Sequence, residues 1–145
     1  MTTLIALVLV LSLSQGDVLP QVATDGGDAD AIRAVVVRAY VDGIHRLRDS
    51  VAVRKGFHPT FVMSVRTETG VNSLGLDAWL QRLALDGKPN PKKIEHKFLN
   101  IDAVGNTATA KLELYIDGKH TFTDFLSLYR FPEGWRIVNK VFERH

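Results

Sequence analysis

The sequence predicts an α+β domain in which a cone-shaped, curved antiparallel sheet wraps around a long N-terminal helix. One amphipathic stretch of helical period, residues 31–47, precedes every long strand. Four long segments rich in β-branched and aromatic residues then fill residues 94–142, with short turns between them. Because the sheet is the only large partner available, we expect the helix to bury its apolar stripe against it. The 145 residues suffice for one such core.

The first helix is predicted over residues 31–47, where apolar side chains recur at intervals of three and four. Either Asp28 or Asp30 can cap its first amides, since a carboxylate suits the positive end of a helix. His45 is expected on the solvent side. The apolar stripe consists of Ile32, Val35, Val36, Ala39, Tyr40, Gly43, Ile44 and Leu47.

Shorter elements are predicted in the middle of the chain. A second helix ends at Gly56, and Pro59 forces an extended backbone at His58. Asp77 is the expected cap of a third helix, whose inner face includes Trp79. The predicted ranges are 51–55 for the second helix, 61–66 for a strand, 68–72 for a turn and 78–85 for the third helix.

Residues 94–142 predict three consecutive hairpins, and two registers are open for the last one. The turns lie at Gly105-Asn106, Asp117-Gly118 and Pro132-Glu133-Gly134. If the last loop has three residues and a bulge, Leu126 lies opposite Lys140, with Asp124 diagonally near it. If the loop has two residues, Asp124 shares its face with Trp135, Ile137 and Asn139, because a slip of one residue exchanges the faces.

Composition argues against several classes of function. The formal net charge is only +2 and the basic residues are scattered, so we expect no nucleic-acid partner. The absence of cysteine excludes disulfides, thiol catalysis and Cys-ligated zinc. No His and carboxylate share the spacing of a metal site, and no Gly-rich phosphate loop occurs, so we expect neither a metal nor a cofactor.

The N-terminus predicts export. Residues 4–13 form an apolar run, too short for a membrane span of roughly 20 residues. Small residues at Ser14 and Gly16 suit a signal peptidase, which predicts a signal peptide (1–16), a linker (17–29) and the domain (30–145). The segment before the run lacks Lys and Arg. The apolar run and the small residues nevertheless favour export to the periplasm or the exterior. If the segment is retained as a packed strand or helix, the expected location is the cytoplasm.

Four segments identify a known fold. They are residues 57–64 (FHPTFVMS), 101–108 (IDAVGNTA), 123–128 (TDFLSL) and 134–142 (GWRIVNKVF). Together with the first helix they resemble the nuclear transport factor 2-like superfamily, in its lumazine-binding-like and polyketide-cyclase-like branches, over residues 30–142. The resemblance implies a cystatin-like cone, a mostly apolar pocket for a small apolar or aromatic molecule, and a homodimer formed through the sheet.

The resemblance also implies candidate catalytic residues. In isomerases and cyclases of the superfamily a pocket Asp acts as base, with a Tyr, a His or a second Asp as partner. Here Asp124 is the candidate base, and Tyr40 and His58 are candidate partners. No second Asp or Tyr is recognisable in register with them, so the catalytic set is incomplete.

Each candidate also has a structural interpretation. Asp124 shares a strand face with apolar residues, so it is either a pocket base or ligand anchor, or a structural partner of Lys140 or of backbone amides. His58 is either a donor at the pocket mouth or a turn residue bonded to backbone. The candidate ligand-binding residues, which fit a core or an interface equally, are Tyr40, Phe61, Trp79, His96, Asp124 and Trp135.

The sequence thus leaves three functions open. It favours an exported, non-catalytic domain that binds a small apolar or aromatic molecule in the cone. The first alternative is an enzyme of isomerase, cyclase or dehydratase type with Asp124 as general base. The second is a non-catalytic association module that uses the outer face of the sheet to bind a second copy of itself or another protein.

Overall fold

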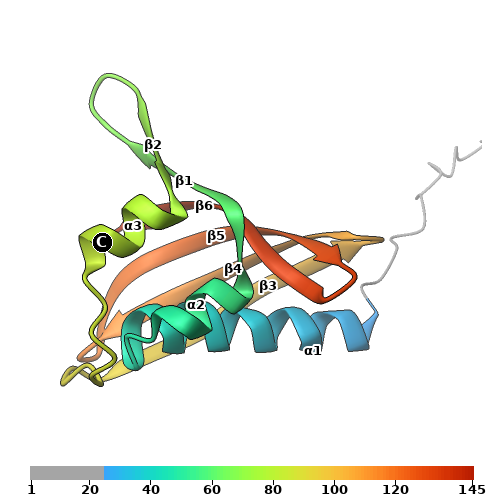
Figure 1. The fold of residues 1–145 in the computed structure, drawn as a ribbon, viewed down its shortest axis with the longest axis horizontal. Coiled ribbons are helices and arrows are strands. Elements are labelled where there is room, and N and C mark those ends of the chain that lie inside the picture. Colours follow the sequence, from blue (N-terminus) through green and yellow to red (C-terminus); the bar gives the residue numbers. More distant parts are fainter. Residues whose placement is uncertain (1–24) are drawn as a thin grey trace, which may run out of the picture.

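The computed structural model describes residues 25–145 and confirms the predicted fold class (Figure 1). The predicted signal peptide and residues 17–24 of the predicted linker lie outside the described residues. In chain order the elements are α1 (Gly26–Val35), η1 (Val36–Arg46), α2 (Ser50–Gly56), β1 (Phe57–Arg66), β2 (Val71–Gly75), α3 (Leu76–Leu83), β3 (Ile94–Val104), β4 (Thr107–Ile116), β5 (Lys119–Phe131) and β6 (Gly134–Arg144).

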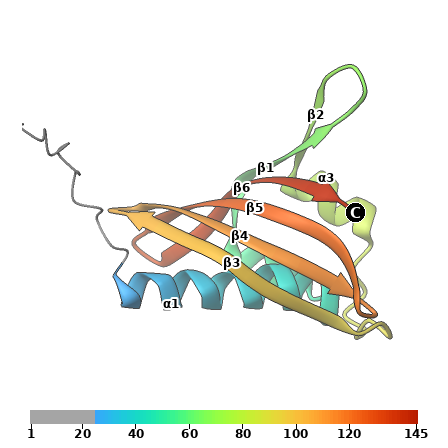
Figure 2. The same cartoon turned by 180° about the vertical axis from the view of Figure 1, so that it is seen from behind.

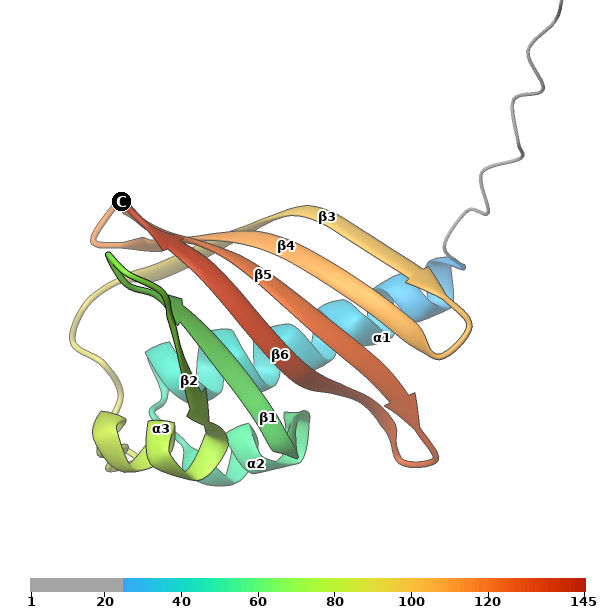
Figure 3. The same ribbon diagram turned by 90° about the horizontal axis from the view of Figure 1, so that it is seen from above.

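The six strands form one sheet in the order β2-β1-β6-β5-β4-β3. β1 runs parallel to β6, and the other neighbours are antiparallel. The sheet curves over the long first helix, as the views from behind and from above show (Figures 2 and 3). Helices α2 and α3 lie on the side of β1 and β2 (Figure 3). The helices therefore cover one face of the sheet and leave the other open.

The first helix begins earlier than predicted. It starts at Gly26, and its N-cap is Asp25, whose carboxylate accepts a hydrogen bond from the Gly27 amide. Asp28, one of the two expected caps, lies in the first turn and forms an ion pair with Arg130 at 2.8 Å. A helix start depends on which of several nearby carboxylates meets the free amides, and the sequence offered three within six residues.

The second half of the first helix, η1, is a π-helix rather than an α-helix. In an α-helix, residues five apart lie about 140° apart around the axis, whereas in a π-helix the hydrogen bonds join residues i and i+5. His45 therefore lies above Tyr40 and points inward, and Val41 is buried with Val36. The prediction that His45 faces solvent was wrong for this reason. Leu47, expected on the apolar stripe, is 49% exposed.

Two local predictions before β3 also differ from the structure. Residues 71–75 form the edge strand β2, whereas the sequence predicted a turn over 68–72 and no strand after it. The strand was missed because it is mostly exposed and has no alternating apolar pattern. The N-cap of α3 is Gly75, without a side-chain hydrogen bond. Asp77, the expected cap, lies in the first turn and contacts Arg54 at 2.7 Å.

The last hairpin combines the two predicted registers. Its loop has two residues, 132–133, and an extra residue at Val138 forms a bulge farther along β6. Beyond the bulge, Leu126 pairs with Lys140. Each predicted register therefore describes one part of the hairpin, and Asp124 shares a face with Lys140 because the bulge restores the alternation.

The core lies between the helices and the covered face of the sheet. Its centre is an aromatic cluster in which Phe57 contacts Phe61 edge to face, with ring centroids 4.8 Å apart, and Trp79 stacks on Phe61 at 5.6 Å. The opposite face carries exposed Phe125 and Val141, which are 44% and 43% exposed and pair across β5 and β6. On the covered face, the rings of Phe57, Phe61 and Trp79 therefore occupy the middle of the cone.

Candidate functional site

Asp124 lies at the centre of the covered sheet face and is fully buried. The Tyr40 hydroxyl, from η1, donates a hydrogen bond to Oδ2 of Asp124 at 2.8 Å. Nζ of Lys140 lies 2.8 Å from Oδ1 and also donates to the Tyr40 hydroxyl. Oδ1 has the ion pair but no hydrogen bond of good geometry within residues 25–145. We call Tyr40, Asp124 and Lys140 the buried triad.

Aromatic rings surround the ammonium group of Lys140. Nζ lies 4.3 Å from the centre of the Tyr40 ring, 4.8 Å from Phe142 and 5.6 Å from Trp79. Ring faces attract a cation, and the attraction grows when water is excluded. The rings and Asp124 together replace part of the hydration that Lys140 loses on burial.

Burial shifts the pKa values of Tyr40 and Lys140 in opposite directions. Burial and then the nearby Asp124 charge raise the pKa of Tyr40 well above its usual value, so its hydroxyl keeps its proton. Burial lowers the pKa of Lys140, and the charge of Asp124 opposes this shift. Both oxygens of Asp124 thus face partners that position it, and the arrangement favours a structural ion pair over a base that reaches a substrate.

His45 is the member of this region that sequence reasoning missed. Its ring meets the Tyr40 ring edge to face at 5.0 Å. Its Nε2 is enclosed and has no hydrogen-bond partner among the described residues. Burial, and to a lesser degree the charge of Lys140, lowers the pKa of His45 to about 3, so the ring is neutral near neutral pH. Only the i+5 geometry of η1 could have revealed this position.

The two other candidate histidines do not join the buried triad through any described contact. His58 stacks on Phe131, with ring centroids 4.8 Å apart, and its Nδ1 accepts a hydrogen bond from the Thr60 amide. This is the geometry of a turn histidine bonded to backbone. Nδ1 of His96 lies 3.3 Å from Nη2 of Arg46, and burial followed by that charge lowers the pKa of His96.

Of the predicted ligand-binding residues, the structure brings together Tyr40, Phe61, Trp79 and Asp124. The rings of Tyr40 and Trp79 lie 6.5 Å apart. Trp135 belongs to a different region, where Arg130 lies over its ring at 5.3 Å. The predicted set therefore divides between the inside of the cone and the start of β6.

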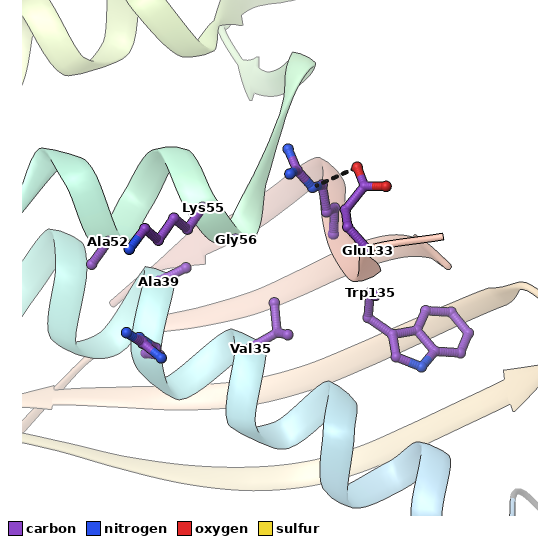
Figure 4. Close-up of a pocket in the computed structure, with 10 residues that line it drawn as sticks. Val35, Ala39, Ala52, Lys55, Gly56, Glu133 and Trp135 are labelled. Carbon is purple, nitrogen blue, oxygen red and sulfur yellow. Dashed lines mark ion pairs between the residues drawn. The ribbon is translucent and has the colours of Figure 1, made fainter. Parts of the chain in front are cut away.

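Trp135 borders a pocket of ≈ 330 Å³ between the helices and the start of β6, which we call the α2 pocket (Figure 4). Figure 4 shows Val35 and Ala39 of the first helix, Lys55 and Gly56 of α2, and Trp135 and Glu133 from the last hairpin around it. The lining residues are Val35, Arg38, Ala39, Ala52, Lys55, Gly56, Glu133, Gly134, Trp135 and Arg136.

A close helix contact forms the floor of the α2 pocket. Gly56 approaches Ala39 so closely that a Cβ atom on Gly56 would lie 2.2 Å from the Ala39 Cβ. Gly134, at φ +119°, allows the turn that carries Trp135 and Arg136. Sequence reasoning missed this pocket, because its charged residues are far apart in the chain and no motif connects them.

The fold and the buried core define a nuclear transport factor 2-like, cystatin-like α+β domain. A protein of unknown function from Shewanella baltica, described as NTF2-like, shares 24% identity with a TM-score of 0.70, over 85% of this chain and 98% of that chain. A domain from Nostoc punctiforme, described as having a cystatin-like fold, shares 18% identity with a TM-score of 0.56, over 84% and 80%.

The family is shown by sequence. The family model described as "Putative lumazine-binding" matches residues 27–143, and the chain belongs to this family. A structure from Novosphingobium aromaticivorans, described as a "putative aromatic ring hydroxylase", is similar at 18% identity and a TM-score of 0.60, over 84% of this chain and 92% of that chain. A search of curated proteins found no match.

Two further observations concern residues 25–145. None of the helices there has the length and hydrophobicity required to cross a membrane. The same residues contain no group of three or more His, Asp or Glu side chains that could hold a metal ion.

Proposed function

We propose that this chain is a non-catalytic domain that binds a small aromatic molecule in the α2 pocket. The observation that carries the proposal is the pocket itself. Its ≈ 330 Å³ is at the lower end of the range of roughly 300–1,000 Å³ for small-molecule sites, and its wall includes a Trp and several small apolar side chains. The family description and the hydroxylase description of one structural relative point to aromatic ligands.

The geometry of the buried triad fits a structural role better than a catalytic one. A general base has to come within hydrogen-bond reach of the proton it removes. Asp124 is fully buried, and Tyr40 and Lys140 already face its two oxygens. The geometry therefore favours binding over isomerase, cyclase or dehydratase chemistry, which remains the alternative proposal for Asp124.

The chain itself offers a direct test, since its two tryptophans mark the two regions. Trp135 borders the α2 pocket and Trp79 borders the buried triad. In ¹⁵N-labelled protein they give two indole N–H signals, which Trp79→Phe and Trp135→Phe variants assign. A panel of neutral and anionic bicyclic aromatics, including lumazine, is then titrated. We expect saturable shifts of the Trp135 signal. Shifts confined to Trp79 would favour a site in the cone, and no shift of either signal would contradict binding.

A second candidate function is self-association through the open face of the sheet. There Phe125 and Val141 form an exposed apolar centre, with Lys111 over the Phe125 ring at 5.1 Å. Polar residues, among them Asn100 and Asn139, border a pocket of ≈ 260 Å³ on this face. Sedimentation equilibrium tests a homodimer: Phe125→Lys should shift the protein to monomer, and a monomeric parent protein would refute the idea.

We also propose that the protein is exported and acts in the periplasm or outside the cell. The proposal rests on the apolar run of residues 4–13 and the small residues Ser14 and Gly16. Expression of the full chain with a C-terminal tag, followed by intact mass measurement, tests it. A mature chain that begins at Asp17 supports export, and an uncleaved chain in the cytoplasm argues against it.

A further inference from the structure

We infer that the α2 pocket selects an anionic planar ligand, such as an aromatic carboxylate, over a neutral ligand of the same shape. The inference rests on the proposed binding function and specifies its ligand class. Three cationic side chains, Arg38, Lys55 and Arg136, line the pocket, against the single carboxylate of Glu133.

The positive charges at the pocket are largely uncompensated. Arg38 and Lys55 have no ion-pair or hydrogen-bond partner among residues 25–145. Within the same described residues, Arg136 forms an ion pair with Glu133 alone, at 3.3 Å, and the Glu133 side chain is 53% exposed. A ligand carboxylate could therefore meet two free cations and share a third with an exposed, solvated partner.

The pairing of the other charges on the same helices makes this pattern selective. Helices η1 and α2 hold four Arg and Lys residues. Arg46 pairs with Asp42 and Arg54 pairs with Asp77, both away from the pocket lining. The two that lack a partner, Arg38 and Lys55, are the two that line the pocket.

The apolar surface between these cations suits a flat ring. Val35 and Ala39 form one side, Ala52 lies beside them, and Trp135 comes from the opposite hairpin. The carboxyl end of α2 contributes a partial negative charge, which disfavours an anion near Gly56 itself. We therefore place the ring between the helices and Trp135, with its carboxylate toward the rim cations.

The first test compares two probes of equal shape, 2-naphthoate and 2-naphthamide, by following the Trp135 indole signal. We expect 2-naphthoate to bind at least about tenfold more tightly at low salt, because charge-assisted hydrogen bonds exceed neutral ones. The difference should shrink as salt is added, since the rim is exposed. Equal affinities would overturn the anion inference and leave the binding function intact. If neither probe perturbs Trp135, the proposed function fails too.

Charge variants then locate the selectivity. Arg38→Gln and Lys55→Gln should each lower the ratio of naphthoate to naphthamide affinity by about two- to fivefold, the upper part of the range for one exposed charge contact. Glu133→Gln should raise this ratio, because it removes the competing carboxylate. Lys119→Gln is the matched control, since this exposed lysine lies at the other end of β5. A ratio that changes equally in all four variants would contradict the assignment to this pocket.

Discussion

The buried triad and the α2 pocket both contain cationic and aromatic side chains, but their cations differ in pairing and exposure. Lys140 is 4% exposed, lies against Asp124 and is surrounded by rings. Arg38 and Lys55 are exposed and unpaired among residues 25–145. A sealed and paired charge makes the fold depend on its partner, whereas an open and unpaired charge remains available to a ligand. The buried triad therefore has the features of a stabilising ion pair, whereas the α2 pocket has those of the proposed binding site.

The largest expected effect comes from breaking the buried pair. Lys140→Met should lower the free energy of unfolding by about 3–5 kcal/mol, because it leaves the Asp124 carboxylate buried without its cation. Urea denaturation measures the loss. The double variant Asp124→Leu with Lys140→Met should be far less destabilised, since it removes both charges. Lys119→Met, at an exposed position, is the control. A loss in Lys140→Met no larger than in this control would mean that Asp124 is solvated after all.

His45 should make stability depend on pH. Its pKa is lowered to about 3 in the folded protein, against ~6.5 in the unfolded chain, so between these values only the unfolded chain binds the proton. The contribution of neutral His45 to the free energy of unfolding is complete above the unfolded pKa. It is lost as the pH falls toward 3, by up to ~1.4 kcal/mol per pH unit. Urea denaturation between about pH 7 and pH 4.5 measures this slope.

The matched variant for this prediction is His45→Phe, which keeps a ring beside Tyr40 and removes the titrating nitrogen. The difference in unfolding free energy between parent and variant should grow as the pH falls. If the two proteins show parallel pH profiles, His45 titrates normally and its ring is hydrated in the folded state.

A smaller effect is expected where α2 meets the first helix. Gly56→Ala should destabilise the protein by about 1–3 kcal/mol, because the new Cβ would lie 2.2 Å from the Ala39 Cβ and force the helices apart. Both residues line the α2 pocket, so ligand affinity should change as well. Gly70→Ala is the control and should change thermal stability little, because a Cβ atom on Gly70 would meet no atom within 4 Å. Equal melting temperatures for the two variants would contradict the close contact.

The smallest effect is expected at an exposed ion pair. Asp77→Asn breaks the ion pair with Arg54. The side chains of Asp77 and Arg54 are 84% and 55% exposed. Solvent already screens this pair, so the free energy of unfolding should change by only about 0–1 kcal/mol. Urea denaturation beside Lys140→Met gives the direct contrast. A loss comparable to that of Lys140→Met would show that burial does not decide the strength of these pairs.

Much of the architecture could be predicted, because it depends on local patterns. The Asp117-Gly118 turn and the alternating flanks define the hairpin of β4 and β5 without any tertiary information. The same pattern placed Asp124 on an apolar strand face, which made it a candidate for an ion pair with Lys140. The α2 helix was predicted to within one residue at each end. Edge strand β2 was missed because it buries too little to show a pattern.

The site was less predictable because it depends on distances across the chain. The inward position of His45 follows from the π geometry of η1, which no propensity rule specifies. The bulge at Val138 decided that Lys140, rather than a neighbour, meets Asp124. The cations of the α2 pocket lie at positions 38, 55 and 136, and only the folded chain brings them together.

By itself, the sequence determined the fold class, the hairpins and the apolar faces, because hydrophobic periodicity and turn residues act over a few neighbours. The tertiary structure alone decided which charges are paired and sealed and which stay open. Pairing depends on register, on helix geometry and on the approach of segments about a hundred residues apart, as Tyr40 and Lys140 show. Burial then gives a charge its energetic weight, because solvent screening disappears only where the chain has closed around it.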